Sequence, residues 1–136
     1  MDRRMRELLE DLLSEASEAE KRALCLAICD DAGHLLHFVR QENAAARGIA
    51  IALDKAYTAA LMECSTSHLH ERLKREGLVL ADFCDARFTS MPGGSPLIRD
   101  KHTLGGLGLS GCAPERDQFW ADKMANCLAQ DNDQTL

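Results

Sequence analysis

The residues best suited to chemistry interrupt an apolar stretch that runs from Ala44 to Met62. They are Asp54, Lys55 and Thr58, which bring an acid, an amine and a hydroxyl within about one helical turn. The stretch is apolar around nearly its whole circumference, which predicts a largely buried helix. Buried polar groups need partners, so an internal ion pair, a subunit contact and a ligand contact all remain open interpretations.

Two glycine-rich stretches, at 93–96 and 105–111, form a second candidate feature. Both can expose backbone N–H groups, and the second leads into a helix that Pro114 opens, where an anion is favoured. Two ordinary tight turns are the alternative interpretation. The second stretch also fits G-x-G-x-x-G, but too few residues follow Gly111 for a dinucleotide-binding unit. Glycines repeated in a strand instead permit close approach by another backbone or a flat ligand.

Metal-ligating residue types give a weaker pattern. Cys64, His68 and Glu71 share one face if the helix continues, and they offer sulfur and nitrogen ligands to a metal or haem. A solvated histidine is the competing interpretation of His68. No Ser-His-Asp or Cys-His arrangement is recognisable from spacing, so the residues alone do not reveal an enzyme.

Length, charge and cysteine content restrict the class of protein. The 136 residues suit a single domain spanning 1–136, with 130–136 expected to be a frayed polar tail. A net charge of −6 argues against a nucleic-acid partner, and no apolar window approaches the length of a membrane span. No export signal is apparent, so the six cysteines are expected to be thiols in a cytosolic protein.

Hydrophobic periodicity predicts an antiparallel sheet with helices on its faces. The first helix is expected from Arg3 to about Lys21, followed by a hairpin whose strands meet at an Asp-Asp-Ala-Gly turn. The expected elements that follow are the helix at 44–62, a short helix at 65–77, an irregular stretch at 91–96, a hairpin at 97–110 and a helix from 114 to about 130.

Three ordered motifs resemble the GlcG/HbpS family, which includes the carboxy-terminal domain of PduO-type proteins. The first is the hairpin at 28–36 with Arg40 after it, and the second is Asp-Lys-Ala-Tyr-Thr-Ala at 54–59 with the later Thr66. The third comprises Pro-Gly-Gly-Ser-Pro-Leu at 92–97 and Gly-Gly-Leu-Gly-Leu-Ser-Gly at 105–111, with Asp117 downstream. The likeness covers most of the chain.

This resemblance implies an α/β (α+β), profilin-like fold with a central antiparallel sheet of about five strands flanked by helices. It also implies symmetric homo-oligomers and, in some members, accessory roles related to haem or corrinoids. Haem-binding relatives of the PduO type take an axial histidine from the first helix. Because no histidine precedes His34 here, that ligation is not carried over.

The leading hypothesis is an accessory protein that binds a small molecule, with haem or a related tetrapyrrole as the candidate cofactor, linked to diol or glycolate utilisation or to microcompartments. Lys55 would supply a cation, Thr58 a hydroxyl and the glycine stretches backbone donors, which together favour a carboxylate. The candidate ligand-binding residues are Arg40, Lys55, Thr58, Gly93, Gly94, Gly111 and Asp117. Replacing Lys55 by Met is expected to weaken the ligand and leave the fold intact.

Two alternatives remain. One is an enzyme acting on a small organic acid, with Lys55 as catalytic base or carbonyl partner and Asp117 assisting. The other is a structural oligomer in which Asp54 and Lys55 make subunit contacts.

Overall fold

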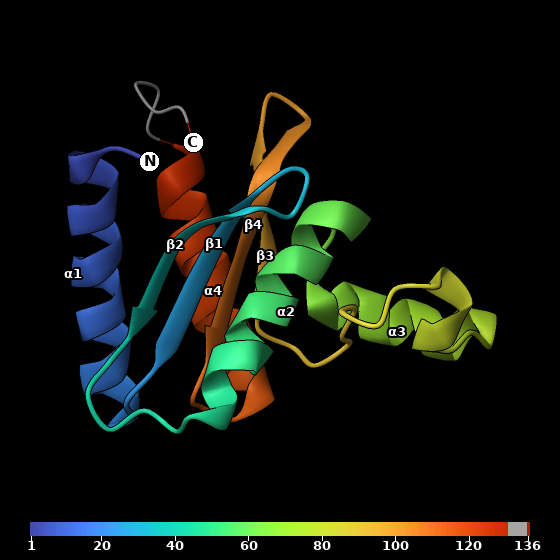
Figure 1. The fold of residues 1–136 in the computed structure, drawn as a ribbon, viewed down its shortest axis with the longest axis horizontal. Helices are drawn as coiled ribbons and strands as arrows, with labels where there is room; N and C mark the ends of the chain where they lie inside the picture. Colours follow the sequence, from blue (N-terminus) through green and yellow to red (C-terminus); the bar gives the residue numbers. More distant parts are fainter. Residues whose placement is uncertain (131–135) are drawn as a thin grey trace.

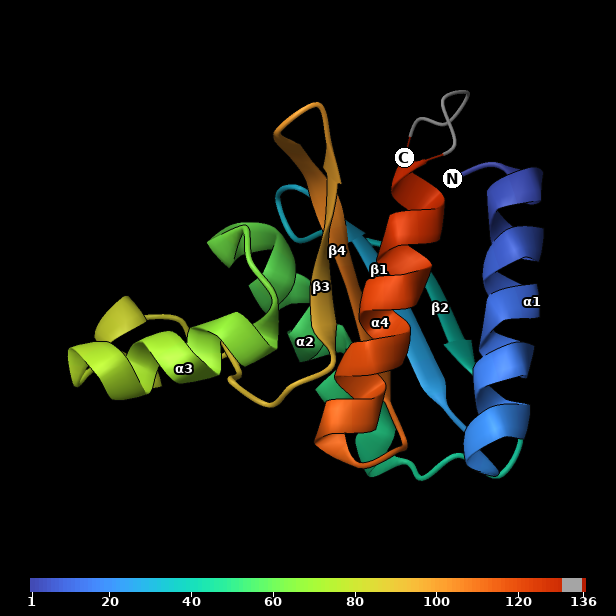
Figure 2. The same cartoon turned by 180° about the vertical axis from the view of Figure 1, so that it is seen from behind.

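The computed structural model describes residues 1–130 and 136, and it shows one antiparallel sheet with helices on both faces. The elements are α1 (Arg3–Glu20), β1 (Cys25–Asp30), β2 (Leu35–Arg40), α2 (Arg47–Met62), α3 (Thr66–Glu76), the 3-10 helix η1 (Leu80–Phe83), β3 (Gly94–Arg99), β4 (His102–Ser110) and α4 (Pro114–Ala129). The sheet order is β2-β1-β4-β3, with α1 and α4 on one face and α2 on the other (Figures 1 and 2).

The mixed α/β class is confirmed, but the sheet has four strands rather than about five. The predicted tail at 130–136 lies almost wholly outside the described residues. None of the described helices combines the length and apolar character needed to cross a membrane.

The first hairpin follows the predicted Asp/Gly turn. Asp30 Oδ1 accepts hydrogen bonds of 2.9 Å from the backbone N–H groups of Ala32 and His34. Gly33 has a φ of +86°, which side chains rarely adopt, and its N–H donates to the Asp30 carbonyl over 3.1 Å. A local carboxylate and a glycine therefore fix the turn.

The second hairpin starts earlier than the sequence indicated. Residues 91–96 were expected to be irregular, but β3 begins at Gly94, and Ser95 and Pro96 pair with β4. Proline is tolerated here because β3 is an edge strand, where an N–H pointing away from the sheet has no strand to bond. The Pro-Gly-Gly motif therefore ends in a strand, which restricts how much of it is free to contact a ligand.

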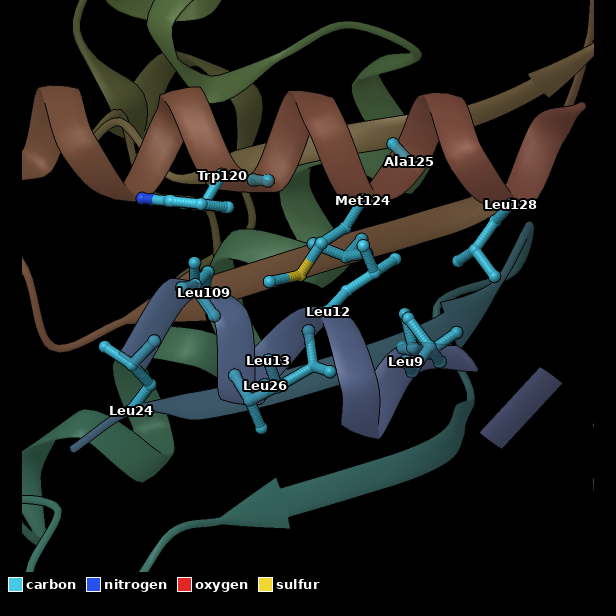
Figure 3. Packing of buried hydrophobic residues seen from close by; sticks show 14 of the residues in the cluster. Leu9, Leu12, Leu13, Leu24, Leu26, Leu109, Trp120, Met124, Ala125 and Leu128 are labelled. Carbon is cyan, nitrogen blue, oxygen red and sulfur yellow. The ribbon is translucent and has the colours of Figure 1, made fainter. Parts of the chain in front are cut away.

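The two faces of the sheet are packed differently. Large apolar side chains fill the space between the sheet and the helices α1 and α4 (Figure 3). Alanines dominate the α2 face, and glycines in β4 bring α2 close to the strand. A Cβ on Gly106 would lie 2.1 Å from the Ala56 carbonyl oxygen, and one on Gly108 would lie 2.1 Å from that of Ala52. The repeated glycines thus admit another backbone rather than a flat ligand.

Candidate functional site

A buried ion pair joins α2, β4 and α4. Lys55 Nζ donates to the Leu109 carbonyl oxygen over 2.8 Å and to Asp117 Oδ2 over 3.0 Å. Only 1% of the Lys55 side chain and 3% of the Asp117 side chain are exposed. The second carboxylate oxygen of Asp117 accepts the Cys112 N–H at 2.9 Å. These bonds fix the start of α4 against the end of β4.

A glycine makes room for this pair. Gly93 has a φ of +129°, and a Cβ placed there would lie 2.6 Å from Lys55 Nζ and 2.9 Å from Asp117 Cβ. Any side chain at this position would therefore displace the lysine or the aspartate. The sequence assigned Gly93 to ligand binding, whereas the structure gives it the role of admitting the ion pair.

Burial brings the two charged groups closer to their neutral forms. It lowers the pKa of Lys55 and raises the pKa of Asp117, while the opposite charge of each partner acts against these shifts. An ammonium carries three donors, and two of those on Lys55 have partners. No partner for the third is found among the described residues, and Lys55 lines a cleft.

This cleft has a volume of about 360 Å³ and lies between the start of α2, the end of β4 and the start of α4. Arg22 and Arg47 line it with exposed side chains, and Lys55 lies at its buried end. Ile51 and Met91 contribute apolar surface. The volume is at the small end of the range for small-molecule pockets, roughly 300–1,000 Å³.

The charge of the cleft is opposite to that of the whole chain. Among the described residues, Asp117 is the one acid that lines it, and Lys55 already neutralises that carboxylate. Neither Arg22 nor Arg47 forms a side-chain ion pair or hydrogen bond within the described part of the chain. The cleft is therefore cationic in a protein of net charge −6, which favours entry of an anion.

Two thiols also face the cleft. Cys25 and Cys112 line it, and both are free. Burial and the neighbouring Asp117 carboxylate raise the pKa of Cys112 to about 12, and burial raises the pKa of Cys25. Both groups are therefore neutral thiols near pH 7 rather than nucleophilic thiolates.

The structure brings together only part of the predicted site. Lys55, Gly111 and Asp117 line the cleft, but Thr58 does not. The Thr58 hydroxyl is fully buried; it donates to the Asp54 carbonyl over 2.7 Å and accepts the Thr89 N–H at 3.0 Å. Its role is to tie the segment before β3 to α2.

Three further predicted residues are used internally. Arg40 donates through Nη2 to the Ala44 carbonyl over 2.8 Å, which fixes the loop before α2. The Gly93 N–H donates to Gln118 Oε1 over 2.7 Å, and the Gly94 N–H donates to Thr66 Oγ1 over 2.9 Å. These N–H groups are therefore not available to a ligand, contrary to the expectation from composition.

The metal candidates Cys64 and His68 lie on α3 and the residues before it, outside the cleft. Across residues 1–130 and 136, no group of three or more His, Cys, Asp or Glu side chains is arranged to hold a metal ion. His68 is exposed, and its backbone N–H donates to the helix-capping Ser65 hydroxyl over 3.1 Å.

Sequence reasoning missed Arg22 and Arg47. Both lie near the end of an element. Arg22 lies between α1 and β1, and Arg47 is the first residue of α2, which begins three residues later than predicted. Neither belongs to a motif. One feature of the sequence could have identified Arg47. No acid lies three or four residues from it on the same face of the helix, so its charge has no local partner.

Comparison with known proteins places the chain in a family. The family model described as "Haem degrading protein HbpS-like" matches residues 2–126. The chain belongs to this family. The resemblance drawn from the sequence motifs is thus confirmed.

Individual relatives agree. Protein GlcG of Escherichia coli (strain K12) is 34% identical over 97 residues, which are 68% of this chain and 69% of GlcG. Klebsiella pneumoniae protein ORFY superposes with a TM-score of 0.83 at 20% identity, covering 96% of this chain and 91% of ORFY. The PduOC:heme complex superposes with a TM-score of 0.81 at 24% identity, covering 93% of both chains.

Proposed function

We propose that this HbpS-like chain is an accessory protein that binds a carboxylate-bearing small molecule in the cleft above Lys55, with haem as the candidate cofactor. One observation carries the proposal: in the part of the chain that the structure describes, three cations line the cleft, and the one acid there is already paired. Arginine guanidinium groups bind carboxylates through two parallel hydrogen bonds. The third donor of Lys55 offers a further bond to an oxygen atom at the buried end.

The haem propionates would suit Arg22 and Arg47, while a cleft of about 360 Å³ would enclose only part of the macrocycle. Among the described residues no histidine lines the cleft and none occurs in α1, so an iron ligand from the cleft would be sulfur. It would be the Met91 thioether, or Cys112 or Cys25 after the thiol has released its proton on binding iron. Bound haem supplies a redox-active iron. Arg22 and Arg47 would hold its carboxylates, and Ile51 would contribute apolar contact.

Two titrations test the proposal. Hemin binding is followed by the Soret absorbance, and lactate binding by calorimetry, for the wild type and for an Arg22→Gln/Arg47→Gln variant. We expect saturable binding of at least one of these ligands and at least a tenfold loss of affinity in the variant. Arg75→Gln is the matched control, because it removes an exposed arginine of α3 that does not line the cleft.

Equal affinity in the wild type and the double variant, or no saturable binding of either ligand, would overturn the assignment. For hemin, His68→Ala and Cys112→Ala distinguish the possible iron ligands. Loss of the Soret shift in His68→Ala alone would move the haem site from the cleft to α3.

Assembly and cellular context are also proposals. We infer that the protein forms a homo-oligomer in the cytosol. We also infer that it has a role in diol or glycolate utilisation or in a microcompartment. The family resemblance supports the homo-oligomer and the metabolic role. A relative from Citrobacter freundii, described as an uncharacterized 15.0 kDa protein in the dhaT-dhaS intergenic region, is 27% identical over 108 residues, which are 76% of this chain and 75% of that protein. Light scattering after gel filtration tests the oligomer, and a monomer mass would reject it.

A further inference from the structure

We infer that the cleft takes an oxo acid, a small carboxylate that also bears a carbonyl group, and that the Lys55 amine forms a reversible imine with that carbonyl. The inference rests on the proposed function, because the cleft must first bind a carboxylate.

The Lys55 amine is held in a fixed position and has one donor to spare. Its Nζ is held by two acceptors, the Leu109 carbonyl and Asp117 Oδ2, and its third donor position has no partner among the described residues. Only 1% of its side chain is exposed, so few water molecules compete for the amine. Lys55 lines the buried end of the cleft, so a molecule bound there is positioned to meet this third donor.

Two arginines line the same cleft as Lys55. Arg22 and Arg47 offer the carboxylate a binding position that does not use Lys55. A ligand held there can direct a second polar group to the amine. A cleft of about 360 Å³ restricts such a ligand to a small molecule.

Asp117 provides the proton transfers that imine formation needs. It takes one proton from the Lys55 ammonium over the 3.0 Å contact, which leaves a neutral amine. The amine nitrogen bonds to the carbonyl carbon, and one of its protons moves to the carbonyl oxygen, giving a carbinolamine. Asp117 returns its proton to that hydroxyl, the C–O bond breaks, and water leaves as the C=N bond forms.

The protons balance. The ammonium begins with three protons; the protonated imine retains one, and the water carries two away. Asp117 ends as a carboxylate, as it began. Burial favours the first transfer, because it lowers the pKa of Lys55 and raises the pKa of Asp117.

Cys112 is the competing nucleophile in the cleft. A thiol adds to a carbonyl as well, but the hemithioacetal that results contains no C=N bond for cyanoborohydride to reduce. The raised pKa of Cys112, about 12, also keeps it protonated near pH 7. Reductive trapping therefore reports on the amine and not on the thiol.

The test is reductive trapping of the full-length protein with pyruvate and sodium cyanoborohydride, followed by intact mass and peptide mapping. We expect one reduced adduct per chain, on the peptide that contains Lys55, with lactate preventing it by competition. Cys112→Ala should retain the adduct. Arg22→Gln/Arg47→Gln, which keeps Lys55, should form it at least tenfold more slowly.

The possible failures are distinguishable. Adducts confined to exposed lysines such as Lys74, or no adduct, while lactate still binds, would overturn the imine and leave carboxylate binding in place. Absence of lactate and pyruvate binding by calorimetry would overturn the site itself. Unchanged trapping in the double arginine variant would show that the arginines do not place the ligand, and would likewise overturn the inference.

Discussion

The two faces of the sheet are built on different principles. On the α1 and α4 face, side chains such as Leu9, Met124 and Leu109 pack between the helices and the strands (Figure 3). On the α2 face, Gly106 and Gly108 remove the side chains and let the helix backbone approach β4 directly. The first face is a conventional apolar core, and the second is a contact between two backbones.

The difference explains where the site lies. A core of large side chains can partly relax when one of them is altered, but two backbones in contact have no side chain that can move away. Such rigidity suits a buried charge pair, because its geometry must be held closely to offset desolvation. Lys55 lies on the helix of the backbone contact and reaches Leu109 and Asp117 at the end of β4 and the start of α4.

The largest expected effect comes from adding one methyl group to the backbone contact. In Gly108→Ala, the new Cβ would lie 2.1 Å from the Ala52 carbonyl oxygen and 2.6 Å from the Ala56 nitrogen. We expect a loss of about 4 kcal/mol or more in the free energy of unfolding, measured by urea denaturation. Gly77→Ala is the control, because nothing lies within 4 Å of its Cβ and only its φ of +66° is unfavourable. Similar losses in both variants would contradict the backbone-contact model.

Lys55→Met should be the next most damaging change. The sequence alone suggested that this replacement leaves the fold intact, but it would leave the buried Asp117 carboxylate without its cation. Removing one partner of a buried ion pair costs roughly 3–5 kcal/mol. Chemical denaturation of Lys55→Met and of Lys55→Met/Asp117→Leu measures this cost. We expect the double variant to recover much of the loss, and a double variant no more stable than the single one would argue against an unpaired charge as the cause.

A substitution in the apolar core should destabilise the protein and leave ligand binding unchanged. Leu9 is fully buried in that core, so Leu9→Ala should lower the free energy of unfolding by roughly 2–5 kcal/mol, because it removes buried methyl groups and leaves a cavity. Ligand affinity measured well below the melting temperature should stay within about twofold of wild type, since Leu9 does not line the cleft. A large fall in affinity would show that the two faces are coupled.

The smallest effect concerns the pH dependence of the apolar face. His37 on β2 has a buried Nε2 without a hydrogen-bond partner in the described residues, and burial lowers its pKa, with Glu10 acting against the shift and Arg6 and the amino terminus in its favour. The folded state therefore prefers neutral imidazole. The stability that His37 contributes is present above its unfolded pKa, near 6.5, and is lost as the pH falls through the lower folded value.

Urea denaturation between about pH 7.5 and about pH 5.5 tests this sign. As the pH is lowered over this range, the free energy of unfolding of the wild type should decrease, and the decrease should be smaller in His37→Gln. His102→Gln, which removes an exposed histidine from the second hairpin, should keep the wild-type slope. A steeper fall in His37→Gln would mean that the protonated form is the favoured one.

Much of the fold follows from local pattern. The spacing of Leu9, Leu12 and Leu13 predicted α1, and the Asp-Asp-Ala-Gly run predicted the first turn, because helix periodicity and turn chemistry act over a few neighbouring residues. The start of β3 was misplaced because Pro96 is tolerated only at a sheet edge, and strand order is not a local property.

The site, too, has features that local sequence pattern predicts and features that it does not. Residue type and period are sufficient to predict that α2 buries an amine and that β4 admits a close neighbour. They do not predict that Lys55 meets Asp117, that Thr58 and the Gly93 and Gly94 N–H groups are used internally, or that Arg22 and Arg47 share a cleft. A hydrogen bond or a cleft depends on distances between elements far apart in the chain, and these distances are set by packing rather than by spacing along the sequence.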